Sequence, residues 1–315
     1  CAGAVALLDP DEDLPAQQHS YHPVSNEELE TILDTLPQKP LLAGEAEVRL
    51  SLAGAQNKLA LFYDENGFAL PLHESPSSHI IKPEAEAFPG LVENENYCLR
   101  LARIVGIPAA EAEPLVLGKH RCLLVRRYDR QWEGNQLVRL HQEDFCQAMG
   151  VPSRLKYQSE GGPHLSHCFD LIRKASSRPA KGLIVLFEAM LFNYLIGNND
   201  AHAKNFSLLY VPSGDGVQVE LAPLYDLVCT ISYPGLSPKM AMKIGGKYLP
   251  GELRLRHWEA FWKEIGFSVK QAQRQTRQFL EKVEQNLLDA AGSEIEEKIQ
   301  SIISERLFNL HRTLG

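Results

Sequence analysis

The hydrophobic pattern changes along the chain, and this change constrains the fold more than any other feature of the sequence. From Glu47 to about Tyr128, short apolar or alternating runs are separated by tight turns such as Asp64–Gly67, which is typical of strands. One helical pattern, at about Glu93–Val105, interrupts these runs. After Tyr128 the apolar residues recur mainly at helical spacing. The sequence therefore predicts an α+β fold with two lobes, a β-rich lobe followed by a mainly helical lobe.

The residues before the β-rich part differ from it in composition. Residues 9–45 are rich in Asp, Glu, Pro and Gln around one helical pattern, Ser25–Leu36, in which Ser25 followed by Glu28 resembles a capping box. Within the later helical part, the polar stretch Ser153–Pro163 is a candidate for low order. The domains that we expect are a connecting segment over residues 1–45, a β-rich domain over residues 46–127 and a helical domain over residues 128–315.

The composition argues against some functions. The chain of 315 residues carries a formal net charge of −8 and has a sequence pI near 5.8, so it lacks the basic surface expected of a protein that binds nucleic acid unaided. Any contact with DNA should therefore come through a partner. The 6 cysteines include no Cys-x-x-Cys pair, which favours reduced thiols in the cytoplasm over a disulfide framework.

The most apolar stretch runs from Leu183 to Gly197 and is interrupted by Glu188 and Asn193. It is shorter than the roughly 20 residues that a membrane-spanning helix needs, so we expect a buried core helix and no membrane association. No charged and then apolar leader opens the visible chain, and nothing in it favours secretion. These features predict a cytoplasmic protein.

The sequence GNNDAHAKNFSLLY follows this apolar stretch and contains Asp200 and Asn205, separated by four residues. This is the Asp-x-x-x-x-Asn spacing of a protein-kinase catalytic loop, in which the Asp orients or accepts the proton of the attacking hydroxyl and the Asn holds magnesium on the phosphates. The pair alone is a weak signal, because Asp and Asn form turns in many ordinary loops. Its position after a buried helix strengthens the kinase interpretation.

A predicted hairpin follows Asn205 and leads to Asp226 in the sequence APLYDLV. The hairpin consists of the strand FSLLY, a turn at Ser213–Gly216 and the strand VQVEL. Kinases use such a hairpin to bring a second acidic residue, their main magnesium ligand, to the catalytic loop, so we predict that Asp226 binds magnesium. The segment departs from Asp-Phe-Gly, because Leu227 and Val228 follow the Asp. For Asp226 alone, the alternative is a helix N-cap after a Pro-containing turn.

The β-rich part supplies candidate groups for binding a nucleotide. The turn SLAGAQNK has small residues at Ala53, Gly54 and Ala55, followed by Lys58, and such a turn lets backbone N–H groups approach phosphate oxygens. It matches neither GxGxxG nor a Walker A sequence, and a plain hairpin is the alternative. Lys82 ends the apolar strand SHIIKP, as expected of the lysine that holds the α- and β-phosphates. Its alternative is a solvated strand end.

Two further elements complete the order found in kinases. The helical pattern after Lys82 begins with Glu93 and Glu95, either of which can pair with this lysine as a kinase helix glutamate does, and we favour Glu95. The stretch LLVRRYDR contains Arg127 and Tyr128 and lies where a kinase hinge presents backbone groups to adenine. The turn, lysine strand, acidic helix, hinge, catalytic loop, hairpin and metal-binding Asp thus follow one another as in a protein-kinase-like fold.

Several of these segments resemble the HipA-like kinases of bacterial toxin–antitoxin modules. The resemblance runs through residues 48–230, and its most specific motifs are AGAQNK, DAHAKN and the loop KYQSEGGP. Other matching segments are HIIKP, ENENYCLRLA, VRRYDR, QEDFCQAMGVPSRL and LAPLYDLV. The opening residues CAGAVALL look like the end of the family's N-terminal subdomain. The resemblance therefore implies that most of that subdomain is missing from this sequence.

The resemblance implies an ATP- and magnesium-dependent serine/threonine protein kinase that a small DNA-binding HipB-like antitoxin holds in check. Family members are similar in targeting aminoacyl-tRNA synthetases, notably the glutamyl enzyme, and so they arrest translation. The resemblance also implies that Ser51 is phosphorylated by the kinase itself and that this phosphate switches the kinase off. By motif, Lys82 would bind ATP, Asp200 would be the catalytic base, and Asn205 and Asp226 would bind magnesium.

Some residues keep competing interpretations. Arg126 stands where the family pattern leads us to expect an acidic hinge residue, which puts side-chain contacts to adenine in doubt. His202 and Lys204 are candidates for contacts with ATP, and their alternatives are an ordinary hydrogen-bonded histidine and a solvated loop lysine. The segment His164–Cys168 has metal-like spacing, but no further ligand cluster is near it in the sequence.

Three functions remain open on the sequence alone. The first is an active protein kinase, and the second is a catalytically silent ATP-binding or antitoxin-binding module of the same fold. Lys82, Asp200, Asn205 and Asp226 together favour the enzyme, because a silent module does not need all four. A small-molecule kinase of similar architecture would require a deep pocket in place of an open peptide groove, and the sequence does not decide this.

Overall fold

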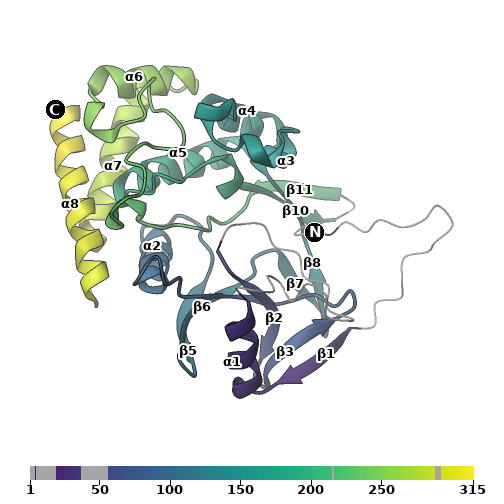
Figure 1. Cartoon of the computed structure of the whole chain (residues 1–315). Helices are drawn as coiled ribbons and strands as arrows, with labels where there is room; N and C mark the ends of the chain where they lie inside the picture. The colour runs from purple at the N-terminus through teal and green to yellow at the C-terminus, as the bar shows by residue number, and fades with distance from the viewer. Residues whose placement is uncertain (1–3, 5–18, 37–55, 215, 288–291) are drawn as a thin grey trace. The chain divides into compact units, whose positions relative to one another are not determined.

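The structure, a computed structural model, describes residue 4 and residues 19–36, 56–214, 216–287 and 292–315. The described chain forms two compact units, and Figure 1 shows the elements of each. The first unit contains the residues up to Val92 and residues 110–142, and the second contains residues 93–109 and 143–315. This division differs from the expected boundaries at residues 45 and 127. Residues 93–109 belong to the second unit, although the residues on both sides of them in the sequence belong to the first.

The first unit is built on a six-stranded antiparallel sheet with the strand order β1-β3-β2-β4-β6-β5. β2 and β3 form the expected hairpin, in which Asp64 lies opposite Gly67. Gly67 has a φ of +109°, which favours glycine because side chains clash there. The strands are β1 (Ser20–Val24), β2 (Leu59–Asp64), β3 (Gly67–Leu72), β4 (His79–Pro83), β5 (Ala112–Leu117) and β6 (His120–Arg126).

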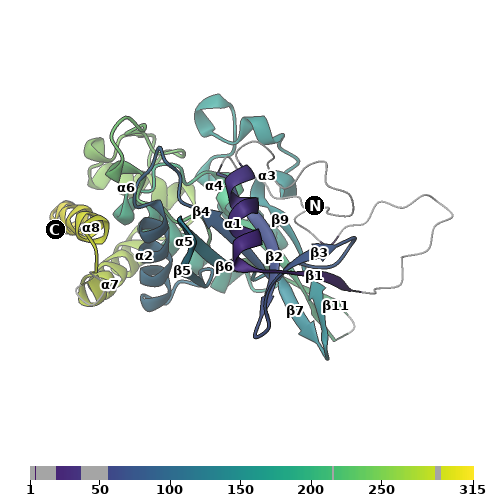
Figure 2. The ribbon, with the colours of Figure 1, turned by 60° about the horizontal axis from the view of Figure 1, so that its bottom comes forward.

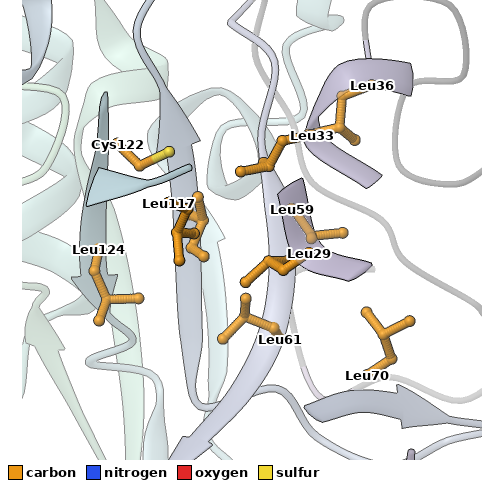
Figure 3. Close-up of a cluster of buried hydrophobic side chains, with 10 residues drawn as sticks. Leu29, Leu33, Leu36, Leu59, Leu61, Leu70, Leu117, Cys122 and Leu124 are labelled. Carbon is orange, nitrogen blue, oxygen red and sulfur yellow. The ribbon is translucent and has the colours of Figure 1, made fainter. Parts of the chain in front are cut away.

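Helix α1 (Asn26–Thr35) packs against this sheet, and Figure 3 shows its leucines facing those of the strands. The expected capping box is present: Ser25 Oγ accepts from Glu28 N at 3.2 Å, and the Glu28 carboxylate accepts from Ser25 N at 2.8 Å. Leu29 and Leu33 are buried in the core of the first unit. The expected connecting segment therefore contains two elements of this unit, because β1 extends the sheet and α1 buries its apolar face against it.

The chain after Tyr128 is not yet helical, in contrast to our expectation. β7 (Arg130–Glu133) and β8 (Gln136–Arg139) pair as a separate antiparallel hairpin. β9 (His141–Asp144) forms the edge of a three-stranded sheet with the order β11-β10-β9. The first helix after Tyr128 is the short α3 (Phe145–Ala148), which directly follows β9.

The second unit is mainly helical and is organised around α5. Tyr194 of α5 meets Trp258 edge-on, with ring centroids 5.2 Å apart, and Phe187 stacks on Phe267 at the same separation. α5 is long and apolar enough to cross a membrane, but 61% of it is buried inside the fold, as expected of a core helix. α7 and α8 lie side by side in Figures 1 and 2. The remaining elements are α2 (Leu91–Ile104), α4 (Leu165–Ala175), α5 (Pro179–Ile196), β10 (Ser207–Ser213), β11 (Gly216–Leu221), α6 (Leu255–Glu264), α7 (Val269–Leu287) and α8 (Glu294–Leu314).

Most of α2 belongs to the second unit, and a buried carboxamide fixes it there. Asn94 Oδ1 accepts from Cys229 N at 2.8 Å, and Asn94 Nδ2 donates to Cys229 O at 3.1 Å. The strand-like residues after α2 add a backbone bond from Leu224 N to Pro108 O at 2.8 Å. Every cysteine in the described part of the chain is buried and unpaired with another cysteine.

Candidate active site

The catalytic-loop sequence lies directly after α5, the buried helix of the second unit. Gly197 ends this helix with a φ of +76°, the left-handed conformation in which glycine is favoured. The backbone then turns tightly, because Asp200 O accepts from His202 N at 2.8 Å. A 3₁₀ turn over Ala203–Asn205 follows. Asp200 and Asn205 therefore lie on one short, hydrogen-bonded stretch of backbone, as the spacing predicts.

Asn198 links this loop to the segment that carries Asp226. Its Oδ1 accepts from Asp200 N at 3.2 Å, and its Nδ2 donates to Asp226 O at 3.3 Å. Asp226 has a φ of +51°, and His73 is the other non-glycine residue with positive φ in the described part of the chain. A non-glycine residue in this region carries strain that the surrounding structure must hold. The structure therefore brings the segments of Asp200 and Asp226 together, as the predicted hairpin requires.

His202 is buried, with 5% of its surface exposed. Burial lowers the pKa of His202, and Lys156 lowers it further, while the carboxylates of Asp200 and Asp226 act in the opposite direction. The imidazole is therefore neutral at pH 7. Its Nε2 lies 4.0 Å from Asp200 Oδ2, and its buried Nδ1 makes no well-formed hydrogen bond with the described residues. The His202 side chain also caps the 3₁₀ turn that ends at Asn205, so a structural role remains the alternative, and a contact of His202 with ATP stays a prediction.

Lys204 is held by an ion pair inside the second unit. Its Nζ lies 2.9 Å from Asp144 Oδ2, and the two side chains are 19% and 12% exposed. Its carbonyl accepts from the Tyr225 hydroxyl at 2.8 Å. The alternative of a solvated loop lysine is therefore wrong, because the charge is paired and largely buried. A contact of Lys204 with ATP stays a prediction.

Sequence reasoning missed Tyr157, whose hydroxyl donates to Asp200 Oδ1 at 2.6 Å. The Tyr157 ring meets the His202 ring edge-on, with centroids 5.2 Å apart. Tyr157 lies in Ser153–Pro163, the stretch that we expected to have low order, yet this stretch contains two 3₁₀ turns and several hydrogen bonds. The signal that could have found Tyr157 is the motif KYQSEGGP, whose role the sequence left open.

The first unit holds two of the predicted nucleotide-binding residues. Lys58 precedes β2, and Lys82 lies on β4 opposite Leu123 of β6. They are 9% and 6% exposed, so Lys82 is not a solvated strand end. In the second unit, Glu95 is 2% exposed and Glu93 is half-buried. The expected pairing of Lys82 with one of these carboxylates stays a prediction.

The expected hinge residues serve the first unit itself. Arg127 N donates to Ser78 O at 3.0 Å, and the Arg127 guanidinium makes two bonds to the Asp129 carboxylate at 2.9 and 2.7 Å. The Tyr128 hydroxyl donates to Gln142 Oε1 at 2.6 Å. Arg127 is thus part of a buried ion pair, and contacts of this stretch with adenine stay a prediction. Ser51, Ala53, Gly54 and Ala55 lie outside the described residues.

Asn205 and Asp226 fit a magnesium ion that arrives with nucleotide phosphates. They offer an amide and a carboxylate oxygen, the ligand type that Mg²⁺ prefers, and phosphates and water usually complete its shell. Asn205 Oδ1 accepts from His202 N at 3.2 Å, which orients the amide, and a carbonyl oxygen has a second lone pair for a metal. These donors fit the ion, and the binding of Mg²⁺ by Asn205 and Asp226 stays a prediction.

The segment His164–Cys168 has a structural role at the start of α4. His167 Nδ1 accepts from His164 N at 3.3 Å, and Cys168 is buried. Within the described ranges, no group of three or more His, Cys, Asp or Glu side chains is arranged to hold a metal ion. Nothing in this segment supports a separate metal centre.

Comparisons with known proteins agree with this arrangement. The family model described as HipA-like C-terminal domain matches residues 50–289. A Sinorhizobium fredii protein that carries the name Putative kinase Y4mE is 46% identical over 275 residues, which cover 85% of this chain and 64% of that protein. The serine/threonine-protein kinase toxin HipA of Shewanella oneidensis is 32% identical over 278 residues, or 84% of this chain and 62% of the toxin. The chain thus spans less than two thirds of the length of these relatives.

Two solved structures have a similar fold. The HipA chain from the complex of Shewanella oneidensis HipA, HipB and operator DNA matches all of this chain with a TM-score of 0.80 and 28% identity, over 76% of its own length. The Helicobacter pylori proinflammatory kinase CtkA matches 84% of this chain and 92% of its own with a TM-score of 0.56 and 15% identity, a likeness of fold alone. The predicted fold class, α+β and two-lobed like a protein kinase, is therefore confirmed.

Proposed function

This chain belongs to the HipA-like C-terminal domain family, and from that premise we propose that it is an ATP- and magnesium-dependent serine/threonine protein kinase. The observation that carries the proposal is the link through Asn198, which hydrogen-bonds to the backbone of both Asp200 and Asp226. It brings a candidate base and a candidate metal ligand together at the end of one buried helix. The kinase names of the relatives support the same reaction.

Each side chain has a specific role in the proposed reaction. The carboxylate of Asp200 is 53% exposed, so it can meet an acceptor hydroxyl and take its proton during transfer. Asn205 and Asp226 hold magnesium on the phosphates, where the ion neutralises charge that develops on the transferred group. Lys82 holds the α- and β-phosphates.

The first experiment tests phosphoryl transfer directly. The purified chain is incubated with labelled ATP, magnesium and a cell lysate, and the proteins that acquire phosphate are identified. Asp200→Asn should preserve ATP binding but slow transfer by roughly 10²–10⁴, the range for losing a positioned general base. Asp170→Asn is the matched control, because Asp170 is an exposed Asp of the same unit that pairs only with Arg173 among the described residues. Equal transfer by the parent and Asp200→Asn would exclude the role of Asp200.

We also propose that this kinase is the toxin of a toxin–antitoxin pair and acts in the cytoplasm. The solved relative is a complex with HipB and operator DNA, which supports a small DNA-binding HipB-like antitoxin as the partner. The formal charge of −8 supports DNA contact through that partner only. A gel-shift assay should show no binding of operator DNA by the chain alone and binding by the chain with the antitoxin. Binding by the chain alone would contradict this arrangement.

The proposed target is an aminoacyl-tRNA synthetase, with the glutamyl enzyme first among them. Phosphorylation of a synthetase would remove a charged tRNA from translation and arrest growth. Labelled lysate proteins should therefore include a synthetase, and the purified synthetase should lose aminoacylation activity after treatment with the parent chain but not with Asp200→Asn. Labelling confined to other proteins would exclude this target.

Ser51 is the proposed site of self-phosphorylation that switches the kinase off. A phosphate there would add about −1.5 to −2 charge beside the turn that we expect to approach the ATP phosphates. Mass spectrometry after incubation with ATP and magnesium should find phosphate on Ser51 in the parent and not in Asp200→Asn. An unmodified Ser51 in a chain that phosphorylates other proteins would contradict the switch. ATP binding without any transfer would instead indicate the catalytically silent module.

A further inference from the structure

The hydrogen bond between Tyr157 and Asp200 joins two residues that are 43 positions apart. The Tyr157 hydroxyl lies 2.6 Å from Asp200 Oδ1, a short distance for an O–H donor and an ionised acceptor. The other oxygen of the carboxylate, Oδ2, lies 4.0 Å from His202 Nε2, which is beyond hydrogen-bonding distance. The Tyr157 hydroxyl therefore holds one carboxylate oxygen of Asp200. The side chain as a whole is half-exposed.

The direction of this hydrogen bond is fixed by chemistry. Burial raises the pKa of Tyr157, and the hydrogen bond with the Asp200 carboxylate and the charge of Glu160 raise it further, so the phenol keeps its proton at any physiological pH. An ionised carboxylate can only accept. Lys156 lies over the face of the Tyr157 ring, with Nζ 4.7 Å from the centroid. Tyr157 is thus a permanent donor to Asp200.

Backbone hydrogen bonds hold the Tyr157 loop against the catalytic loop. Ala241 N donates to Asn199 O at 2.8 Å, and Ala241 O accepts from Gln158 N at 3.4 Å. Lys243 N adds a bond to Gln158 Oε1 at 2.7 Å. The residue before Asp200 and the residue after Tyr157 are therefore both tied to residues 241–243. This closed arrangement sets the position of the phenol independently of the Tyr157–Asp200 bond itself.

We propose that Tyr157 is a positioning residue for Asp200, the proposed base. The Tyr157 hydroxyl holds the carboxylate so that Asp200 Oδ2 faces the acceptor hydroxyl. This inference rests on the proposed kinase function. During transfer, the acceptor oxygen bonds to the phosphorus as the bond from phosphorus to the leaving nucleotide oxygen breaks. The acceptor proton passes to Asp200 Oδ2, and Tyr157 keeps its own proton. Without the phenol, the carboxylate can rotate away from this geometry.

The test is the kinetics of Tyr157→Phe, which removes the hydroxyl and keeps the ring. The kcat for phosphoryl transfer should fall by about 10- to 100-fold, the usual effect of losing a group that orients a catalytic side chain, while KM for ATP with magnesium stays unchanged. His202, Lys156, Glu160 and Asp226 are the other titratable groups around this pair, and the substitution leaves them in place.

Tyr210→Phe is the matched control. The Tyr210 hydroxyl also donates to a carboxylate, that of Glu143 at 2.5 Å, and lies in the same unit. Since this hydrogen bond goes to Glu143 and not to Asp200, its loss should leave kcat unchanged. A loss of activity in both variants would indicate a general structural effect and would overturn the positioning role.

A second measurement reports the hydrogen bond without catalysis. In a chain labelled with ¹³C at tyrosine Cζ, Asp200→Asn should shift the Tyr157 resonance, and an unmoved resonance would contradict the contact. Transfer by the parent chain together with a normal kcat in Tyr157→Phe would exclude the positioning role and leave the kinase function standing. A parent chain that transfers no phosphate would overturn both.

Discussion

Asp226 has a backbone conformation that few side chains adopt, with a φ of +51°. Asp and Asn enter this left-handed region more readily than other non-glycine residues, and the remaining cost has to be offset by the surroundings. The bond from Asn198 Nδ2 to Asp226 O provides part of this support. The strained backbone of Asp226 is therefore consistent with a residue whose position serves metal binding and not the stability of the fold.

Asp226→Asn should therefore keep the fold and lose magnesium-dependent ATP binding. ATP with magnesium at 100 times its dissociation constant should stabilise the parent by about 2.7 kcal/mol, and the variant should lose most of this gain. Thermal unfolding with and without ATP and magnesium measures it, with Asp170→Asn as the control. A ligand-induced shift in Asp226→Asn that equals the parent's would remove Asp226 from the metal site.

Asp129 shows how much a buried charge depends on its partners. Burial acts to raise the pKa of Asp129, but the charges of Arg127 and Arg130 and the hydrogen bonds from Arg127 outweigh it, so the pKa lies below its usual value. Asp129 Oδ2 lies 2.7 Å from Arg127 Nη2 and 2.9 Å from Arg130 Nη1. Because the folded state favours the ionised form, the carboxylate stabilises the fold above its unfolded-state pKa of about 3.9.

Asp129→Asn should destabilise the chain by about 3–5 kcal/mol, because it leaves two buried arginines without their charge partner. The free energy of unfolding of the parent should decrease as the pH drops below about 4. In Asp129→Asn this decrease should be smaller, because the titrating carboxylate is absent. Glu111→Gln is the control, since it breaks an Arg126–Glu111 pair whose side chains are 62% and 64% exposed and should cost no more than about 1 kcal/mol. Urea unfolding at several pH values measures both variants, and equal losses would contradict the argument.

At the scale of elements, the sequence predicted what depends on neighbouring residues and missed what depends on distant ones. The β2–β3 hairpin, the capping box of α1 and the core helix α5 follow from local turn residues and apolar spacing. The strands β7, β8 and β9 have only four residues each, and β9 has only polar side chains, so none of them shows a clear strand pattern in the sequence. β1 was missed for a similar reason, because its edge position leaves most of its side chains exposed.

The candidate site divides in the same way. Asp200 and Asn205 could be predicted because their spacing is fixed by one turn of backbone. The hydrogen bond from Tyr157 and the ion pair from Asp144 to Lys204 join residues 43 and 60 positions apart. No local pattern marks such pairs, because each depends on how the loop or β9 packs against the catalytic loop.

Gly162 lets the Tyr157 loop close. A Cβ at Gly162 would lie 2.2 Å from Leu155 O and 2.7 Å from Tyr157 O, so Gly162→Ala should force the loop open at a cost of about 1–3 kcal/mol. Phosphoryl transfer should fall with it, because Tyr157 would move away from Asp200. Gly251→Ala is the control: its Cβ would meet nothing within 4 Å, and the change should stay within about 0.5 kcal/mol. Thermal unfolding and transfer assays compare the two, and matching results would mean that loop closure tolerates a side chain.

At the scale of the whole molecule, the two units are interleaved along the chain. The second unit takes α2 from the middle of the first unit's sequence, and Asn94 of α2 satisfies both the N–H and the carbonyl of buried Cys229. Tyr97 and Leu101 of the same helix are fully buried. The second unit therefore lacks part of its core and two hydrogen bonds if it is cut from the chain at Glu143.

A fragment of residues 143–315 should not unfold cooperatively by itself. The buried N–H of Cys229 would lose its partner, which costs about 1–3 kcal/mol, and the apolar surface that α2 covers would be exposed. A synthetic peptide of residues 91–110, added in trans, should restore a sharp thermal transition in circular dichroism, and the same peptide with Asn94→Ala should restore less. If the fragment alone unfolds sharply near the temperature of the parent chain, α2 is dispensable to the second unit.

The backbone bonds among Asn199, Ala241 and Gln158 also bear on how this family can diverge. Backbone N–H and C=O groups are the same in every residue except proline, so most side chains along these loops can change without breaking the ties. Insertions or deletions cannot be absorbed as easily, because they would shift which groups meet. Loop length, together with the few residues Tyr157, Gly162 and Asp200, is then the property that selection has to preserve here, and distant relatives should vary in composition along these loops before they vary in length.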